Sequence, residues 1–184
     1  MFPNKLMWCV DSVEAVEKSA AGVRWLMRSY GAPLVLYHAM RPYAGELDAY
    51  REKKREQAAA VEEAAERLGL LDGFVTFLVD DEIGGLADSI VKTALAHEVD
   101  LVVVPTHSRK GLERLIFGSV AERVTRSCKL PVLTVDIGRL PVDDGSASAF
   151  DRVYSFTDFS KPAEQALFAA AGFAQRLGCP LTAV

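Results

Sequence analysis

The sequence predicts an α/β fold in which a doubly wound, five-stranded parallel sheet carries helices on both faces. Three observations predict it. Short β-rich runs alternate with helical runs, the helical runs are long enough to be crossover connections, and the β-rich runs are apolar throughout rather than at every second position. Strands joined by helices pair in parallel, and strands buried on both faces are continuously apolar. A ligand site in such a fold lies at the carboxyl ends of the strands, where the strand order reverses.

Each element follows from its local pattern. Strands are expected at residues 5–10, 34–37, 74–79, 101–104 and 131–135. Helices, with apolar residues at helical spacing, are expected at 13–29, 46–68, 86–97 and 119–127. Gly31 and Gly69 end the first two helices, since glycine is the usual residue just past a helix.

The chain after residue 136 predicts a second, incomplete unit. Residues 137–149 are rich in Gly, Asp, Ser and Pro and read as a linker between a domain at 1–136 and a tail at 150–184. A shift of 147 places Asp11 on Asp158, Gly31 on Gly178 and Leu34 on Leu181. The tail therefore repeats the strand, helix and strand that open the chain, and it stops at its second strand.

Composition excludes several classes of protein. Half of the 184 residues are hydrophobic and the net charge is −4, so no basic field attracts nucleic acid. The apolar runs are far shorter than the ~20 residues of a membrane helix. The three cysteines, Cys9, Cys128 and Cys179, are widely spaced, which favours a reduced, cytoplasmic compartment over a disulfide framework.

The segment after the fourth strand carries the most informative motif. Pro105, Ser108, Gly118 and Ser119 stand at the spacing G-x2-G-x9-G-[S/T]. In this motif, and over about residues 4–136, the chain resembles the universal stress protein family, and the tail looks like the start of a second such domain. The resemblance implies a Rossmann-like fold of the adenine nucleotide α-hydrolase type. It also implies a cytoplasmic regulator or sensor of the stress response that binds ATP, with Mg²⁺ only as a companion of ATP.

The motif is suited to binding phosphate, and this chain keeps some of its residues. Glycines let backbone N–H groups approach phosphates, and a helix N-terminus adds partial positive charge. Gly118 and Ser119 keep that pattern, whereas Pro105 has no N–H and Ser108 carries a Cβ. Positive charge from Arg109 and its neighbours offers compensation. Ser119 with Glu122 also forms a capping-box pattern, which is compatible with a phosphate contact.

The resemblance assigns candidate binding residues. It places the base of ATP near Asp11 and Ala39, and the phosphates over Ser108, Gly118, Ser119 and Val120, with Arg109 neutralising charge. For Asp11 a second interpretation stays open, in which it is the N-cap of the first helix with Glu14 three residues on.

Other polar residues favour structural roles. His38 is expected to pack at the end of the second strand rather than act as a base, and the acidic run Asp80–Glu82 is expected to be a solvated loop. No GxSxG, HExxH or complete Walker loop is present in the sequence, so binding is favoured over catalysis.

The fifth strand predicts the oligomeric state. The resemblance implies that the strand at 131–135 lies at a sheet edge and pairs with a partner domain, and this strand is apolar and would be hazardous if left exposed. A homodimer through this strand is therefore expected, and the resemblance also implies a regulatory protein partner. The loss of both leading glycines keeps an alternative function open. In that alternative, the chain is a dimeric interaction module that binds no nucleotide.

Overall fold

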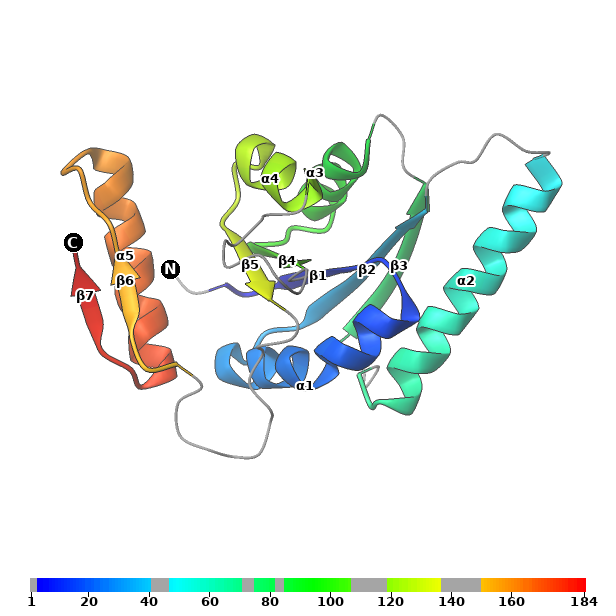
Figure 1. The fold of residues 1–184 in the computed structure, drawn as a ribbon, viewed down its shortest axis with the longest axis horizontal. Helices are drawn as coiled ribbons and strands as arrows, with labels where there is room; N and C mark the ends of the chain where they lie inside the picture. Colours follow the sequence, from blue (N-terminus) through cyan, green and yellow to red (C-terminus); the bar gives the residue numbers. More distant parts are fainter. Residues whose placement is uncertain (1–2, 41–46, 71–74, 82–84, 107–118, 137–149) are drawn as a thin grey trace, which may run out of the picture.

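A five-stranded parallel sheet forms the centre of the molecule (Figure 1). The structure is a computed structural model that describes residues 3–40, 47–70, 75–81, 85–106, 119–136 and 150–184. The strand order is β3-β2-β1-β4-β5, and all neighbours are parallel. The strands are β1 (Leu6–Val10), β2 (Leu34–Met40), β3 (Val75–Asp81), β4 (Leu101–Thr106) and β5 (Val132–Asp136). The predicted doubly wound sheet is confirmed.

Helices cover both faces of this sheet. Helices α1 (Val13–Tyr30) and α2 (Leu47–Arg67) lie on one face, and α3 (Leu86–Ala96) and α4 (Ser119–Ser127) on the other. Successive residues of β1 point to opposite faces, so Trp8 is buried under α1 and α2 while Met7 is buried under α3 and α4. Burial on both sides explains why the strands are apolar throughout. In the described ranges, none of the helices is both long and apolar enough to cross a membrane.

Three strands run further than their sequences predicted. Strand β2, which was expected to end at Tyr37, continues through Met40. Strand β3 continues through Asp81, and Asp80 and Asp81 pair with Ala39 and Met40 of β2. The interpretation of these two acids as a solvated loop was therefore wrong, because backbone pairing with β2 holds them in extended conformation; Glu82 lies outside the described residues. Strand β4 likewise continues through Pro105 and Thr106, where it pairs with β5.

The C-terminal segment has its own small sheet. It consists of β6 (Val153–Ser155), α5 (Lys161–Leu177) and β7 (Leu181–Ala183), with the two strands parallel. Leu6 pairs with Leu34 in the first unit and Val153 pairs with Leu181 here, so the shift of 147 relates the pairing as well as the sequence. The boundaries of the two predicted domains stay predictions, since the linker at 137–149 lies outside the described residues.

The two units differ by one residue where the strand meets the helix. The Ser12 hydroxyl accepts a hydrogen bond from the Ala15 N–H at the start of α1, and Ser160 accepts one from Ala163 at the start of α5. These caps are one residue further apart than the shift of 147. Just before the second cap lies Phe159, with a φ of 62° and a side chain that is 94% exposed. A left-handed backbone at a bulky residue is unfavourable, so this connection is the strained part of the repeat.

An aromatic cluster attaches the C-terminal unit to the first. The ring centroid of Phe173 on α5 lies 6.2 Å from that of Tyr30 on α1 and 6.1 Å from that of Phe150, which lies 5.6 Å from Trp25. These separations suit tilted aromatic pairs. Burial raises the pKa of Tyr30 to about 12, and the Arg176 guanidinium opposes part of that rise.

Candidate functional site

The strand order reverses between β1 and β4, and their pairing stops short there. The chain runs outward from β1 through β2 to β3 and then returns to β4 on the other side of β1. The β1–β4 ladder extends only from Leu6–Leu101 to Trp8–Val103, although β1 continues to Val10 and β4 to Thr106. Open α/β sheets bind their ligands at such a reversal, outside the carboxyl ends of the strands.

The early end of this ladder accommodates Pro105. A proline within a central strand would remove a ladder hydrogen bond. Pro105 lies two residues beyond the last β1–β4 pair, and on its other side it keeps its place opposite Val135. The next residue, Thr106, donates its hydroxyl to the Val135 carbonyl at 3.1 Å. Because Pro105 lies beyond the end of this ladder, its lack of an N–H removes no hydrogen bond to β1. Pro105 lies at the edge of the candidate site.

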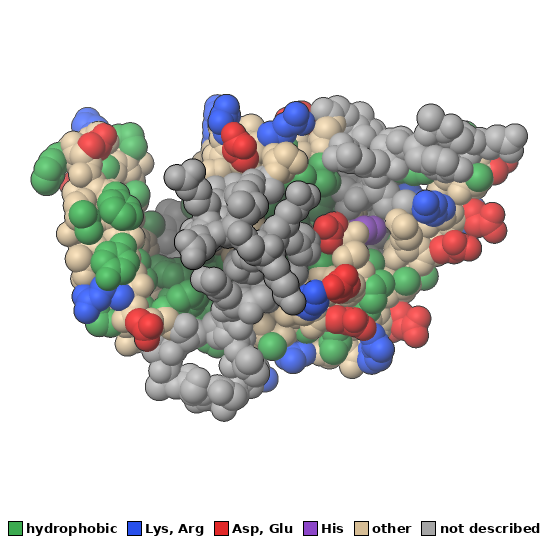
Figure 2. Space-filling view, viewed as in Figure 1, with side chains coloured by type: hydrophobic (Ala, Val, Ile, Leu, Met, Phe, Trp, Pro, Cys, Tyr) green, Lys and Arg blue, Asp and Glu red, His purple; other side chains and the backbone are tan. Residues whose placement is uncertain are grey.

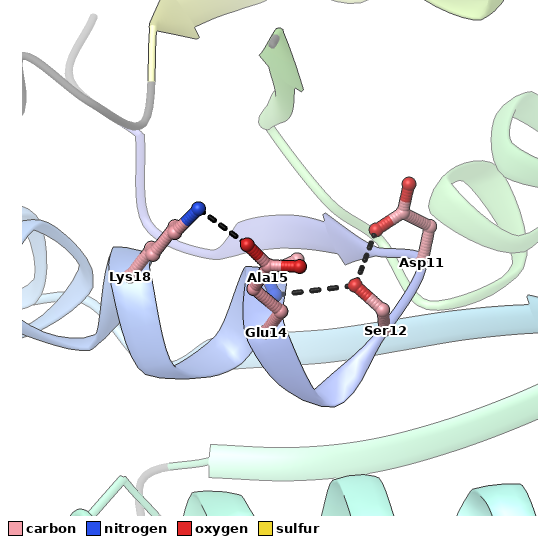
Figure 3. Close-up of polar contacts among 5 residues, drawn as sticks. All are labelled: Asp11, Ser12, Glu14, Ala15 and Lys18. Carbon is pink, nitrogen blue, oxygen red and sulfur yellow. Dashed lines mark hydrogen bonds and ion pairs between the residues drawn. The ribbon is translucent and has the colours of Figure 1, made fainter.

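Asp11 follows β1 directly and is positioned by Ser12 (Figure 3). The Ser12 hydroxyl donates to the Asp11 Oδ1 at 3.0 Å and accepts from the Ala15 N–H at 3.2 Å. One side chain thus links the Asp11 carboxylate to the first turn of α1. Asp11 itself is exposed, at the edge where the β1–β4 ladder has ended.

The interpretation of Asp11 as the N-cap was wrong, because Ser12 holds that position. Glu14 forms an ion pair with Lys18 on the next turn. Asp and Ser are almost equally good caps, so their types could not decide between adjacent positions. The start of α1 at Val13 decides it in favour of Ser12, which sequence reasoning missed as a site residue.

The start of α4 supplies the second part of the candidate site. The helix is described from Ser119 to Ser127, and Gly118, the residue before it, lies outside the described residues. The Glu122 Oε1 accepts a hydrogen bond from Arg126 at 2.8 Å. The capping box of Ser119 and Glu122 stays a prediction. N–H groups in the first turn of a helix, here those of Ser119 and Val120, have no carbonyl partner within the helix and carry its positive dipole.

The remaining predicted residues are placed only in part. Ala39 lies near the carboxyl end of β2, which is the strand next to β1. Ser108, Arg109 and Gly118 lie outside the described residues. The structure therefore brings Asp11, Ala39 and the start of α4 to one edge of the sheet. The phosphate-binding role of Ser108, Arg109 and Gly118 stays a prediction.

Strand order also separates the acids of β3 from α4. Asp80 and Asp81 end β3, which is three strands away from β4 in the sheet. At roughly 4.8 Å per strand, that spacing is about 14 Å. It exceeds the screening length of ~8–10 Å at physiological salt. Repulsion between these two acids and an anion bound at the start of α4 would therefore be weak.

His38 joins the ends of β1 and β2. Its ring is 3% exposed, and its Nδ1 lies 3.0 Å from the Val10 carbonyl, which confirms the expected packed role. A carbonyl can only accept, so Nδ1 is the donor in this bond. Within the described part of the chain, Nε2 is buried without a hydrogen-bond partner. The bond to Val10 fixes the residue that precedes Asp11.

Replacing His38 with leucine is expected to lower the free energy of unfolding by about 1–2 kcal/mol, because it removes this buried hydrogen bond at similar side-chain volume. Urea denaturation followed by circular dichroism measures the change. His97→Leu is the control, since His97 is half-buried just after α3. Equal losses in the two variants would contradict the role given to His38.

The thiol of Cys9 is held un-ionised beneath α3 and α4. Burial raises the pKa of Cys9, and the neighbouring Cys128 adds to that rise. A thiol is a poor nucleophile until it ionises, so Cys9 contributes packing rather than reactivity.

Taken together, the strand order, the reversal between β1 and β4 and the helix that starts beside it define a doubly wound α/β protein with a candidate ligand site at the carboxyl edge of its sheet. The sequence model of the universal stress protein family matches residues 4–136. The chain belongs to that family.

Individual relatives agree with this assignment. A universal stress protein of Methanocaldococcus jannaschii is 47% identical over 49 residues, which is 27% of this chain and 29% of that protein. The crystal structure of a universal stress protein from Archaeoglobus fulgidus has a TM-score of 0.71 at 20% identity; the match covers 98% of this chain and 64% of that one. Another from Archaeoglobus fulgidus, in complex with dAMP, has a TM-score of 0.51 at 18% identity and covers 74% of this chain and 100% of that chain.

Proposed function

We propose that this chain is a regulator or sensor of the stress response that binds ATP at the carboxyl edge of its sheet. The observation that carries the proposal is the early end of the β1–β4 ladder at Trp8 and Val103, between Asp11 and the start of α4. Membership of the family supports it, and so does the dAMP complex of a relative with the same fold.

Each part of the site has a chemical role in this proposal. The Asp11 carboxylate, held by Ser12, accepts hydrogen bonds from ribose hydroxyls. The backbone of β2 near Ala39 lies beside the base. The first N–H groups of α4, at Ser119 and Val120, face the phosphates, where the helix dipole favours negative charge. Ser108, Arg109 and Gly118 complete the phosphate loop on the evidence of their spacing. Mg²⁺ enters only with ATP, since it is bound chiefly through phosphates.

Calorimetric titration of the folded chain with ATP and Mg²⁺ tests the proposal. We expect saturable binding, and we expect Asp11→Ala to weaken it roughly 10-fold or more, as for other lost hydrogen bonds to charged groups. Glu14→Ala is the matched control, because Glu14 is an exposed acid on the same turn that pairs with Lys18. A folded protein that gives no heat at millimolar ATP would refute nucleotide binding.

The alternative function is a nucleotide-free interaction module, and Pro105 is the observation that favours it. Pro105 stands where the motif has its first glycine, and it has no N–H to offer a phosphate. The double variant Pro105→Gly, Ser108→Gly distinguishes the two functions. Binding that appears only in this variant would assign the natural chain to the alternative.

A homodimer through β5 accompanies either function as a proposal. Among the described residues β5 pairs with β4 alone, and Val132, Leu133 and Val135 of this strand pack against the core. An apolar edge strand of this kind favours pairing with a second chain. A regulatory protein partner is proposed on family resemblance alone.

A further inference from the structure

The last pair between β1 and β2 carries a side-chain hydrogen bond beside the candidate site. Val10 and His38 lie opposite each other at the end of this ladder. The His38 Nδ1 also donates to the Val10 carbonyl at 3.0 Å, between residues 28 positions apart in the sequence. Asp11 follows Val10 directly, and Ala39 follows His38. One bond therefore connects the two residues that immediately precede Asp11 and Ala39.

The end of β1 depends on β2 for its place in the sheet. Across the residues that the structure describes, the β1–β4 ladder ends at Trp8 and Val103, so Cys9 and Val10 pair with β2 alone. The Val10 carbonyl and the Asp11 N–H belong to one planar peptide unit. A bond that holds this carbonyl therefore also holds the plane from which Asp11 extends.

The bond lies inside the molecule, on the face of the sheet that α1 and α2 cover. Leu34 and Leu36 pack in the core on that face, and alternation along β2 places His38 on the same side. Figure 2 shows charged side chains of both signs on the surface over α1 and α2. The His38 ring is only 3% exposed, so water competes little for its donor and the bond is strong for its kind.

We propose that His38 is a positioning residue of the nucleotide site, which fixes the distance between Asp11 and Ala39 and so the fit of the nucleoside part of the ligand. This role rests on the proposed function, in which the ribose lies at Asp11 and the base beside Ala39. His38 acts through Val10 rather than by touching the ligand, while Ser12 holds the Asp11 carboxylate. Binding residues need such supporting contacts, since a small displacement loosens the site.

Two substitutions of His38 separate positioning from packing. Leucine removes the donor at similar volume, whereas asparagine is smaller but places an amide N–H near the position of Nδ1. Calorimetric titration with ATP and Mg²⁺ measures affinity, and urea denaturation measures stability. We expect His38→Leu to weaken ATP binding roughly 10-fold, as for one lost hydrogen bond. His38→Asn should keep most of the affinity, although the cavity it leaves lowers the stability.

A double-mutant cycle shows whether His38 acts through Asp11. If it does, the loss of His38 matters only while Asp11 is present, so the double variant His38→Leu, Asp11→Ala should bind ATP no more weakly than Asp11→Ala alone. Val23→Ala is the control for general destabilisation, because Val23 is fully buried in the second half of α1. It should lower the stability and leave the affinity for ATP unchanged.

A measurement without nucleotide keeps this role apart from the proposed function. The amide nitrogen resonance of Asp11 senses the bond to the Val10 carbonyl, since both groups belong to one peptide unit. It should shift in His38→Leu and return in His38→Asn. If the natural chain binds no ATP, the proposed function fails, and this resonance alone decides whether His38 holds Asp11. An Asp11 resonance that ignores His38→Leu, additive losses in the cycle, or an affinity as weak in His38→Asn as in His38→Leu would each overturn the positioning role.

Discussion

Replacing Trp8 with alanine is expected to lower the free energy of unfolding by about 3–5 kcal/mol, the range found when a large buried aromatic side chain is truncated. Trp8 is the largest of the fully buried side chains, at 1% exposure. It lies in the middle of the sheet under α1 and α2, and it forms the last pair between β1 and β4. Chemical denaturation followed by circular dichroism measures the loss.

Trp8→Phe is the matched control for this prediction. In the described part of the chain, the indole N–H of Trp8 is buried and has no hydrogen-bond partner. Phenylalanine keeps most of the packing and removes that unpaired donor, so its cost is expected to stay below about 1.5 kcal/mol. A loss as large as that of Trp8→Ala would contradict the account, since it would show that the N–H is satisfied in solution.

Replacing Phe173 with alanine is expected to release the C-terminal unit from the first unit at a cost of about 2–3 kcal/mol. The side chain of Phe173 contacts Tyr30 and Phe150 and packs against the larger core. Truncating it removes most of the aromatic contact. Amide hydrogen exchange measures the effect where it occurs. Exchange in α5 should accelerate roughly 30-fold or more, while β1 and β2 stay protected.

Two further measurements check the attachment. Phe168→Ala changes the same residue type on the same helix, but Phe168 is 71% exposed, so exchange should not change. Alkaline pH should act like Phe173→Ala. The pKa of Tyr30 is raised to about 12, so its contribution is complete below about pH 10 and is lost as the pH rises towards 12. Attachment that survives both Phe173→Ala and this pH range would show that other contacts hold the unit.

The fold could be predicted well because the spacing of the apolar residues and the glycines that end the helices indicate the same elements along the chain. The helix at 119–127 begins and ends where it was expected, and Gly31 and Gly178 end their helices in the same left-handed conformation. The lengths of β3 and β4 could not be predicted. Asp81 and Pro105 are unfavourable in strands, and only their neighbours in the sheet, Met40 and Val135, show that pairing continues.

The candidate site could be predicted less completely. The family resemblance assigned Asp11 to the site, and the structure puts Asp11 at the point where the strand order reverses. Ser12 was missed as its partner, because a serine next to an aspartate gives two equally good caps and only the helix start distinguishes them. The bond between His38 and Val10 joins residues 28 positions apart, and no local pattern encodes it.

The repeated segment has a consequence for the order of folding. Strand β1 pairs with β2 across a single helix, whereas its pairing with β4 joins residues 95 positions apart, Leu6 and Leu101. Closing a short loop costs less chain entropy than closing a long one, and local contacts form faster. The strand-helix-strand segment that the chain repeats is therefore the part of the sheet whose paired strands lie nearest to each other in the sequence. We expect β1-α1-β2 and β6-α5-β7 to be early structures on the folding pathway, formed before β4 completes the sheet.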